Sequence, residues 1–428
     1  MFENILKDLQ KSNQAFNTSY PGEPATRQPV HTVYGGAHLF SRQLAQKMSE
    51  ASLKVLKEYA PTGKAWHQLL GQGDLSFWEK IHRRIEFKLK NEAVEDFRID
   101  FEDGYGNRAD TEEDGHAKSV ATEVAQGFKE QSLPPYIGIR IKPLSHEAAA
   151  RSLRTLNIFL TTLSKELGSQ NSGKFFERFV VTLPKITHTG QAVALRKALE
   201  TLEKDLDFKT GILKFEIMVE TTQAIMNDQG ACPLRDFVSA GGGRCMAAHF
   251  GTYDYTAGSN ITASYQAMNH SVCDFAKHMM KAALTGTGVT LSDGATNVMP
   301  IGSVEVVHRA WKLSHSHIRH SLINGFYQGW DLHPAQLPIR YATVFSFFQE
   351  SLEPTTQRLK LFVEKAARAT LLGDVFDDAA TGQGLLNFFL RGLSCGAITQ
   401  DEALATGLSL KEIQSRSFLK ILEGRKKS

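Results

Sequence analysis

Short apolar runs alternate with longer segments of helical periodicity along most of the chain. We predict strands at residues 31–34, 96–101, 136–141, 179–183, 214–219, 245–250, 289–291 and 328–332. We predict helices between them at 111–131, 146–167, 190–206, 261–284 and 304–323. Eight strands alternating with helices favour an α/β fold, a (β/α)8 TIM barrel with a parallel sheet. A doubly wound open sheet is the alternative with the same alternation.

Three features extend this plan. Residues 1–29 are predicted to form a peripheral N-terminal segment, and residues 30–350 the barrel. Two helices, at 41–59 and 75–90, are predicted as an insertion after the first strand. Residues 351–428 are predicted to be a helical C-terminal extension, with a glycine-rich break at 381–384.

The composition is that of a soluble globular protein, with 42% hydrophobic and 22% charged residues among 428. Because 49 basic residues face 46 acidic ones, we expect no general attraction to nucleic acid or to a membrane. The four cysteines show no C-x-x-C spacing, which argues against a metal-thiolate cluster and a disulfide framework. The N-terminus lacks the apolar core of a signal peptide, and no run reaches the roughly 18 apolar residues of a membrane span. We therefore expect a cytoplasmic protein.

Charged residues gather where the predicted strands end, which is where barrel enzymes place their reacting groups. Glu220 and Asp254 follow successive strands, so their carboxylates are expected to converge at the barrel mouth. Two carboxylates with waters and a bidentate substrate form a typical Mg²⁺ site, and Mn²⁺ is also compatible with such ligands. Arg140 is placed to hold the carboxylate of a 2-oxo acid with its planar fork. Taken singly, Glu220 and Asp254 are explained as well by helix capping and a turn.

Six sequence blocks resemble, in the same order, those of the citrate-lyase beta-subunit-like family, also called the HpcH/HpaI aldolase family. The blocks are DFRIDFEDGYGNRADTEEDGHAKS, YIGIRIKP, VVTLPKI, IMVETTQAI, HFGTYDYTA and GWDLHPAQL. The resemblance covers about residues 30–350 and implies a TIM barrel with a metal site. It implies much less about the substrate, because members handle acyl-CoA thioesters or aldol products of pyruvate.

The resemblance assigns roles to single residues. It implies metal ligation by Glu220 and Asp254 and substrate binding by Arg140. It places Glu102 and Asp103 around the waters of the metal, as catalytic groups. Lys185 and Gly251, in the family's "LPK" and "FG-x-x-D" blocks, are expected to contact the substrate; a Schiff-base role for Lys185 is the weaker alternative. Members of the family usually assemble as trimers or hexamers, so a homo-oligomer is expected.

The sequence departs from the family at the first strand. The family has an Arg-Ser pair before this strand and a "VPG" turn after it, whereas this chain has Gln28-Pro29 and Gly35-Gly36 there. Arg27 is close to the family's arginine but out of register. Recognition of a CoA thioester or a substrate carboxylate therefore does not follow from the resemblance, and the chain is interpreted as a divergent member.

A proton transfer at the enolate carbon requires a general acid or base. His38, just after the first strand, is the candidate, and a histidine satisfied within its loop is the alternative. His249 and His333 are expected to be structural, and the histidines at 315, 317 and 320 are expected to point to different faces of one helix. Asp374, Asp377 and Asp378 are expected in a solvated loop, with a catalytic acid from the C-terminal segment as the alternative.

The resulting hypothesis is a Mg²⁺-dependent carbon–carbon lyase or aldolase that acts on a 2-oxo acid or a 3-hydroxyacyl substrate, including CoA thioesters, through an enolate. Its partners are then small molecules, not nucleic acid or membrane. One alternative is a phosphotransferase of the phosphoenolpyruvate/pyruvate type on the same barrel. The other is a metabolite-binding barrel without turnover.

Overall fold

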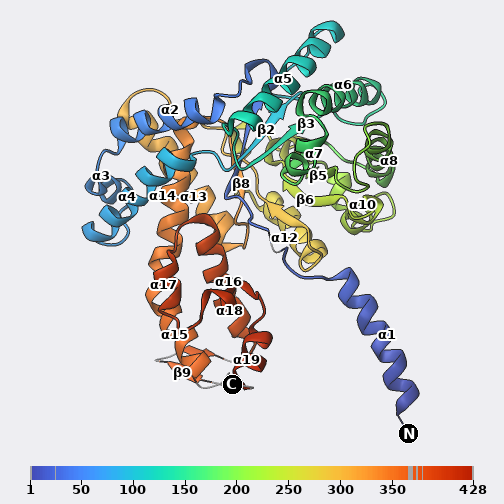
Figure 1. Cartoon of the computed structure of the whole chain (residues 1–428). Helices are drawn as coiled ribbons and strands as arrows, with labels where there is room; N and C mark the ends of the chain where they lie inside the picture. Colours follow the sequence, from blue (N-terminus) through green and yellow to red (C-terminus); the bar gives the residue numbers. More distant parts are fainter. Residues whose placement is uncertain (1, 25, 365–369, 373–374, 378, 427–428) are drawn as a thin grey trace.

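The computed structural model describes residues 2–24, 26–364, 370–372, 375–377 and 379–426. Eight parallel strands form the central barrel (Figure 1). They are β1 His31–Gly36, β2 Asp96–Asp100, β3 Tyr136–Arg140, β4 Phe179–Leu183, β5 Lys214–Val219, β6 Cys245–Phe250, β7 Thr290–Ser292 and β8 Gly329–Asp331. Every predicted strand is confirmed, with ends shifted by at most two residues at either side.

The strand order distinguishes the two predicted architectures. The sheet runs β7-β6-β5-β4-β3-β2-β1-β8, so β8 pairs with β1 and the order never reverses as it does in a doubly wound sheet. The gap between β7 and β8 is bridged just beyond β7, where the Trp330 N–H donates to the Gly294 carbonyl at 2.9 Å. The predicted TIM barrel is thus confirmed.

Helices surround the barrel as expected from the alternation. The long ones are α5 Asp110–Glu130, α6 Ala149–Leu167, α8 Thr189–Asp205, α12 Ser271–Leu284, α13 Val304–Ile323 and α14 Leu337–Glu350. Shorter ones are α7 Ser169–Phe176, α9 Thr222–Ile225, α10 Leu234–Ala240 and α11 Thr252–Gly258. The prediction at 261–284 was wrong in its first part. The helix begins only at Ser271, because the His270 side chain accepts a hydrogen bond from the Val272 N–H and caps it.

The insertion after β1 contains three helices instead of the predicted two. They are α2 Leu44–Tyr59, α3 Gly63–Leu70 and α4 Leu75–Glu92. The unpredicted α3 is held by Trp66, whose ring centroid lies 6.3 Å from that of Trp78 in α4 and 5.1 Å from that of Trp311 in α13. Gly71, at φ 72°, ends α3 in the left-handed conformation.

The C-terminal part is not purely helical, which corrects the prediction. After α15 Leu352–Glu364, the short strands β9 Thr370–Leu372 and β10 Val375–Asp377 pair antiparallel. Then follow α16 Ala379–Cys395, α17 Gln400–Leu404, α18 Leu410–Gln414 and α19 Phe418–Lys426, a lobe below the barrel in Figure 1. Asp374 and Asp378 lie outside the described residues, and Asp377 is described only as the end of β10.

The predicted helix break at residues 381–384 is wrong, because this glycine-rich segment lies inside α16. A Cβ on Gly382 would lie 2.4 Å from Cε1 of Phe362 and 2.9 Å from Cδ1 of Phe418. The glycine therefore permits close packing of α16 against α15 and α19, and the gain from that contact outweighs its low helix propensity.

The chain begins with helix α1, Glu3–Ser19, which projects from the barrel (Figure 1) and contains no buried residue. Across the part of the chain that the structure describes, every helix is too short or too polar to cross a membrane.

Candidate active site

The loop after β2 forms one side of the barrel mouth and is organised by Asp100, the last residue of the strand. The Asp100 carboxylate accepts hydrogen bonds from the Glu102 N–H at 2.9 Å and the Gly104 N–H at 2.7 Å. A Cβ on Gly104 would lie 2.6 Å from Oδ2 of Asp100, so this turn requires a glycine. These bonds fix the direction of Glu102 and Asp103, the acidic pair predicted from the sequence.

Arg140, the last residue of β3, is buried at the centre of the mouth. Its Nε donates to Asp100 at 2.7 Å, and its Nη2 donates to the other oxygen of the same carboxylate. Its Nη1 lies 3.1 Å from Oε2 of Glu102, and its guanidinium lies 4.9 Å from the centre of the Tyr34 ring. The fork that was expected to hold a substrate carboxylate is therefore engaged by Asp100, and the remaining Nη1 contacts Glu102 and the Met218 sulfur.

Lys185 follows β4 and connects the acidic groups of neighbouring strands. Its backbone adopts φ 49°, a left-handed conformation that is uncommon for residues other than glycine. Its Nζ bonds to Glu102, lies 2.9 Å from Oδ2 of Asp103 and 3.6 Å from Oδ2 of Asp254. Burial lowers the pKa of this amine, but Glu102 and the other carboxylates raise the pKa overall, so the ammonium form is retained.

Glu220 and Asp254, the predicted metal ligands, close the other side of the mouth. Glu220 follows β5 and is 1% exposed, and its Oε1 accepts a hydrogen bond from the Lys185 N–H at 2.7 Å. Asp254 lies in the first turn of α11 with 40% of its side chain exposed. Burial and the negative charge of Asp254 raise the pKa of Glu220 to about 8. Burial thus disfavours the ionised form of Glu220 and keeps its pKa high, and the charge of Asp254 adds to this effect.

Gly251, expected at the substrate, makes room for Glu220. A Cβ at this position would lie 2.4 Å from Oε2 and 2.5 Å from Cβ of Glu220. Any larger residue would displace the carboxylate. The "FG-x-x-D" block therefore has two roles, since it contains Asp254 and its glycine leaves room for the side chain of Glu220.

The balance of charge in this cluster favours a cation. Five carboxylates, those of Asp100, Glu102, Asp103, Glu220 and Asp254, face two cations, Arg140 and Lys185. The fully ionised cluster would carry three excess negative charges. In the described part of the chain, no three or more His, Cys, Asp or Glu side chains form a complete metal cage. Two carboxylates that rely on water and substrate for the remaining ligands fit Mg²⁺ better than a cage-binding metal.

A cavity of about 480 Å³ opens beside Lys185, Glu220 and Asp254. Its other walls come from uncharged groups, among them Thr187, Gln191, Thr222 and Gln223. A small organic substrate fits this volume.

The barrel interior beneath the mouth carries a second charged layer, which we did not predict. Arg98 donates to both oxygens of Glu216 at 2.8 Å and also binds Asp96. Burial raises the pKa of Glu216, but Arg98 and His249 lower the pKa to well below its usual range. The sequence contains the pattern, because Asp96, Arg98 and Asp100 alternate along β2 and therefore face the same side.

The histidine candidates make their contacts with groups other than the five carboxylates of the mouth. His38 packs against Tyr105 and His116, with ring centroids 5.7 and 6.5 Å away, and burial lowers its pKa. Its Nδ1 is buried without a hydrogen-bond partner among the described residues. In α13 the predicted divergence is confirmed, since His315 contacts Thr343, His317 contacts Thr296 and His320 contacts Asp274.

His249 and His333 are structural, as predicted. The His249 Nδ1 accepts a hydrogen bond from the Trp330 indole N–H at 3.2 Å inside the barrel. The His333 side chain accepts a hydrogen bond from the Ala335 N–H at 3.1 Å and so caps the turn after β8.

Comparisons with known proteins support the fold and give a family. A family model described as "Domain of unknown function (DUF6986)" matches residues 9–421. No curated protein matches the chain. A citrate lyase from Burkholderia xenovorans LB400 superposes with a TM-score of 0.57 at 20% identity, covering 76% of this chain and 91% of that one. A malate synthase from Haloferax volcanii, solved as a lead(II) complex, has a TM-score of 0.50 at 12% identity, covering 94% and 98%. At these identities the likeness is one of fold.

Proposed function

The chain belongs to the DUF6986 family, and we propose that its barrel is a Mg²⁺-dependent carbon–carbon lyase or aldolase. The substrate that we propose is a 2-oxo acid or a 3-hydroxyacyl compound, a class that includes acyl-CoA thioesters. The observation that carries this proposal is the cluster of five carboxylates and two cations at the carboxyl ends of β2 to β6. Barrel enzymes place their chemistry at this end.

Glu220 and Asp254 would hold the metal, with Mn²⁺ as a substitute. The fit rests on their hard oxygen ligands, and burial together with the negative charge of Asp254 raises the pKa of Glu220, so a cation beside both carboxylates would stabilise their ionised forms. When bound, the metal would supply positive charge that stabilises the enolate left by carbon–carbon cleavage. Glu102 and Asp103 would bind its waters, which agrees with the way Asp100 and Lys185 orient them.

The residues of the chain itself would bind and orient the substrate. Nη1 of Arg140 is the one group of that guanidinium not bound to Asp100, and it would donate to a substrate oxygen. Lys185 would contact the substrate from the other side while holding Glu102, Asp103 and Asp254 together. The buried position of Arg140 strengthens its electrostatic effect, because little water competes for it.

Two of the solved structures with this fold support the proposal. They are a citrate lyase and a malate synthase, both named after small carboxylic acids. The malate synthase was solved with a divalent cation, lead(II). We therefore propose small-molecule carboxylic acids as partners of this chain.

The test is titration calorimetry of Mg²⁺ into the full-length protein with pyruvate or oxaloacetate present. A second readout is Mg²⁺-dependent exchange of the pyruvate methyl protons with solvent deuterium, followed by NMR. We expect metal-dependent binding and exchange that Glu220→Ala reduces at least tenfold. The matched control is Glu79→Ala, an exposed glutamate in α4, which should leave both unchanged.

Two outcomes would refute the proposal. One is the absence of metal-dependent binding of either acid. The other is binding by Glu220→Ala at the level of the unaltered protein, since it would exclude Glu220 as a ligand.

A further inference from the structure

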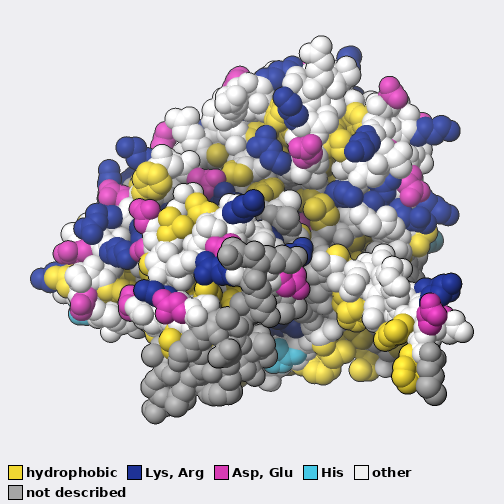
Figure 2. Space-filling model, turned by 60° about the horizontal axis from the view of Figure 1, so that its bottom comes forward, with side chains coloured by type: hydrophobic (Ala, Val, Ile, Leu, Met, Phe, Trp, Pro, Cys, Tyr) yellow, Lys and Arg dark blue, Asp and Glu magenta, His cyan; other side chains and the backbone are white. Residues whose placement is uncertain are grey.

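Helix α1 and its N-cap residue Phe2 expose an apolar face, and among the described residues the one ring that packs on this face is Tyr20, stacked on Phe16. The 17 residues of α1 include no buried one, and Phe2, Ile5, Leu6, Leu9 and Phe16 are each between 52% and 63% exposed. At 3.6 residues per turn these side chains form one stripe. Figure 2 shows hydrophobic side chains at the end of this helix, at the lower right. Most of the stability of a helix in a protein comes from the packing of its apolar face, so a partner surface on this stripe would stabilise α1.

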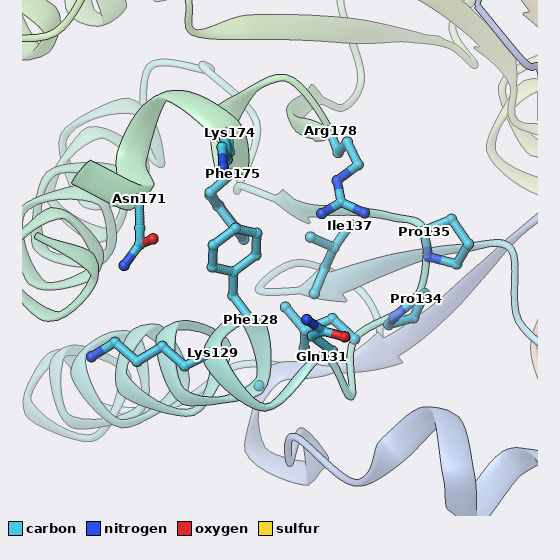
Figure 3. Close-up of a pocket in the computed structure, with 12 residues that line it drawn as sticks. Phe128, Lys129, Gln131, Pro134, Pro135, Ile137, Asn171, Lys174, Phe175 and Arg178 are labelled. Carbon is cyan, nitrogen blue, oxygen red and sulfur yellow. The ribbon is translucent and has the colours of Figure 1, made fainter. Parts of the chain in front are cut away.

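A groove on the face of the barrel opposite the candidate active site is complementary to this helix, because it combines apolar walls with basic side chains. It lies between the end of α5, residues 131–135 and α7, and holds a cavity of about 440 Å³ (Figure 3). Its apolar wall consists of Phe128, Leu133, Pro134, Pro135, Ile137 and Phe175. Three cations surround it, Lys129, Lys174 and Arg178, and none of the lining residues is acidic.

The cations of the groove are largely uncompensated. Within the described residues, Lys174 and Arg178 form no ion pair, whereas the nearby Arg42 is paired with Glu123 and Glu130. Lys129 donates to the Glu166 carbonyl at 2.7 Å. Lys129 and Lys174 lie in the last turns of α5 and α7, and such cations stabilise helix ends. Arg178 follows α7 and has no such role. The partial negative charges at the C-terminal ends of α5 and α7 are therefore too small to balance the three full positive charges.

The charges of α1 match this groove. At about 100° per residue, Glu3 and Asp8 flank the apolar stripe on either side, and Lys7 and Lys11 lie on the opposite face. A helix docked by its stripe would therefore present two carboxylates to the rim and keep its lysines in solvent. We propose that α1 of one copy docks into the groove of a second copy, with Glu3 and Asp8 facing Lys129, Lys174 and Arg178.

A second copy is needed because the base of α1 is held elsewhere. Tyr20 stacks on Phe16 at 4.7 Å and lies under the Arg235 guanidinium at 4.6 Å, beside α10. The Gly22 N–H then donates to the Gly286 carbonyl at 2.9 Å, before β7. These contacts fix the link to the side of β6 and β7, whereas the groove adjoins β3 and β4.

The five apolar side chains of the stripe expose roughly 500 Å² in total, taking about 100 Å² for each, and docking would remove part of this area from water. A membrane surface is the less suitable partner, because helices that bind membranes carry an excess of Lys and Arg on the polar face, and α1 has equal numbers of acidic and basic residues.

The test is an exchange of charge across the contact, read by light scattering coupled to size-exclusion chromatography of the full chain. Glu3→Lys with Asp8→Lys on α1, or Lys174→Glu with Arg178→Glu in the groove, should each raise the apparent Kd of the assembly at least tenfold. The four substitutions together should restore it. Lys7→Glu with Lys11→Glu, on the solvent face of α1, is the matched control and should leave the mass unchanged.

A disulfide gives a second readout that does not depend on assembly strength. A mixture of Leu9→Cys and Leu133→Cys chains should form a covalent dimer on mild oxidation, and neither variant should do so alone. The proposal is overturned by a monomer at every concentration, by charge reversals without effect, or by a Leu9→Cys homodimer, which would indicate α1 pairing with itself. Binding of α1 to neutral or anionic vesicles, lost on its deletion, would overturn it as well.

Discussion

The pair of Asp100 and Arg140 gives the sharpest prediction about the site. Asp100 is 1% exposed and accepts two hydrogen bonds from the Arg140 guanidinium and two from backbone N–H groups. Asp100→Asn keeps the shape but removes the charge. Leaving a buried cation without its partner costs about 3–5 kcal/mol in comparable pairs. Because asparagine retains one acceptor and Glu102 stays 3.1 Å from Nη1 of Arg140, we expect a loss at the lower end of this range, about 3 kcal/mol in the free energy of unfolding.

The assay is a double-mutant cycle by urea unfolding, with Asp100→Asn, Arg140→Gln and the combination. If the two side chains act as one unit, the double variant should be more stable than the sum of the single losses predicts, by about 2 kcal/mol. Arg319 and Glu350 form an equally bidentate pair near the surface, so Glu350→Gln is the control and should cost less than about 1 kcal/mol. Additivity within about 0.5 kcal/mol at Asp100 and Arg140 would refute this interpretation of the mouth.

Three further predictions follow from single contacts. Gly251→Ala should weaken Mg²⁺ binding at least tenfold in calorimetry while the circular dichroism spectrum is retained, because the added Cβ would lie 2.4 Å from Oε2 of Glu220; unchanged binding would contradict the role of Glu220. Burial lowers the pKa of His317 to about 4, below its unfolded value of about 6.5, so its contribution to stability is complete above pH 6.5 and is lost as the pH falls toward 4. The loss should reach about 2 kcal/mol at pH 5, and His317→Gln should flatten the dependence of Tm on pH between 7 and 5. Trp66→Ala should lower the free energy of unfolding by about 3–5 kcal/mol in denaturant titration, because the ring is fully buried against Trp311; a loss under about 1 kcal/mol would show that α3 is dispensable.

The sequence was sufficient for the main elements of the barrel. Most of the eight strands follow from short apolar runs, as in buried parallel sheets, whereas β2 alternates charged with apolar residues. The long helices α5, α6, α8 and α13 follow from their periodicity. The third helix of the insertion was missed because α3 has only eight residues, too few for a period to be distinct.

The candidate site was predicted as a set of residues, without its internal connections. Glu102, Asp103, Arg140, Lys185, Glu220 and Asp254 lie at one mouth, which follows from the rule that strand ends meet there. The engagement of Arg140 by Asp100 was not predicted. It depends on the parallel register in which Asp100 of β2 lies beside Arg140 of β3. Such a pairing joins residues 40 positions apart, and spacing in the sequence does not specify it.

The sequence by itself determined which residues form strands and helices, and which charged side chains stand at the strand ends. These properties are local, because they depend on periodicity and on the residue that follows each strand. Only the tertiary structure shows which charges neutralise one another and which neighbours require a glycine at positions 251 and 382. It also shows that the apolar stripe of α1 is exposed. These depend on distances between segments remote in the chain, and those distances exist only once the barrel has closed.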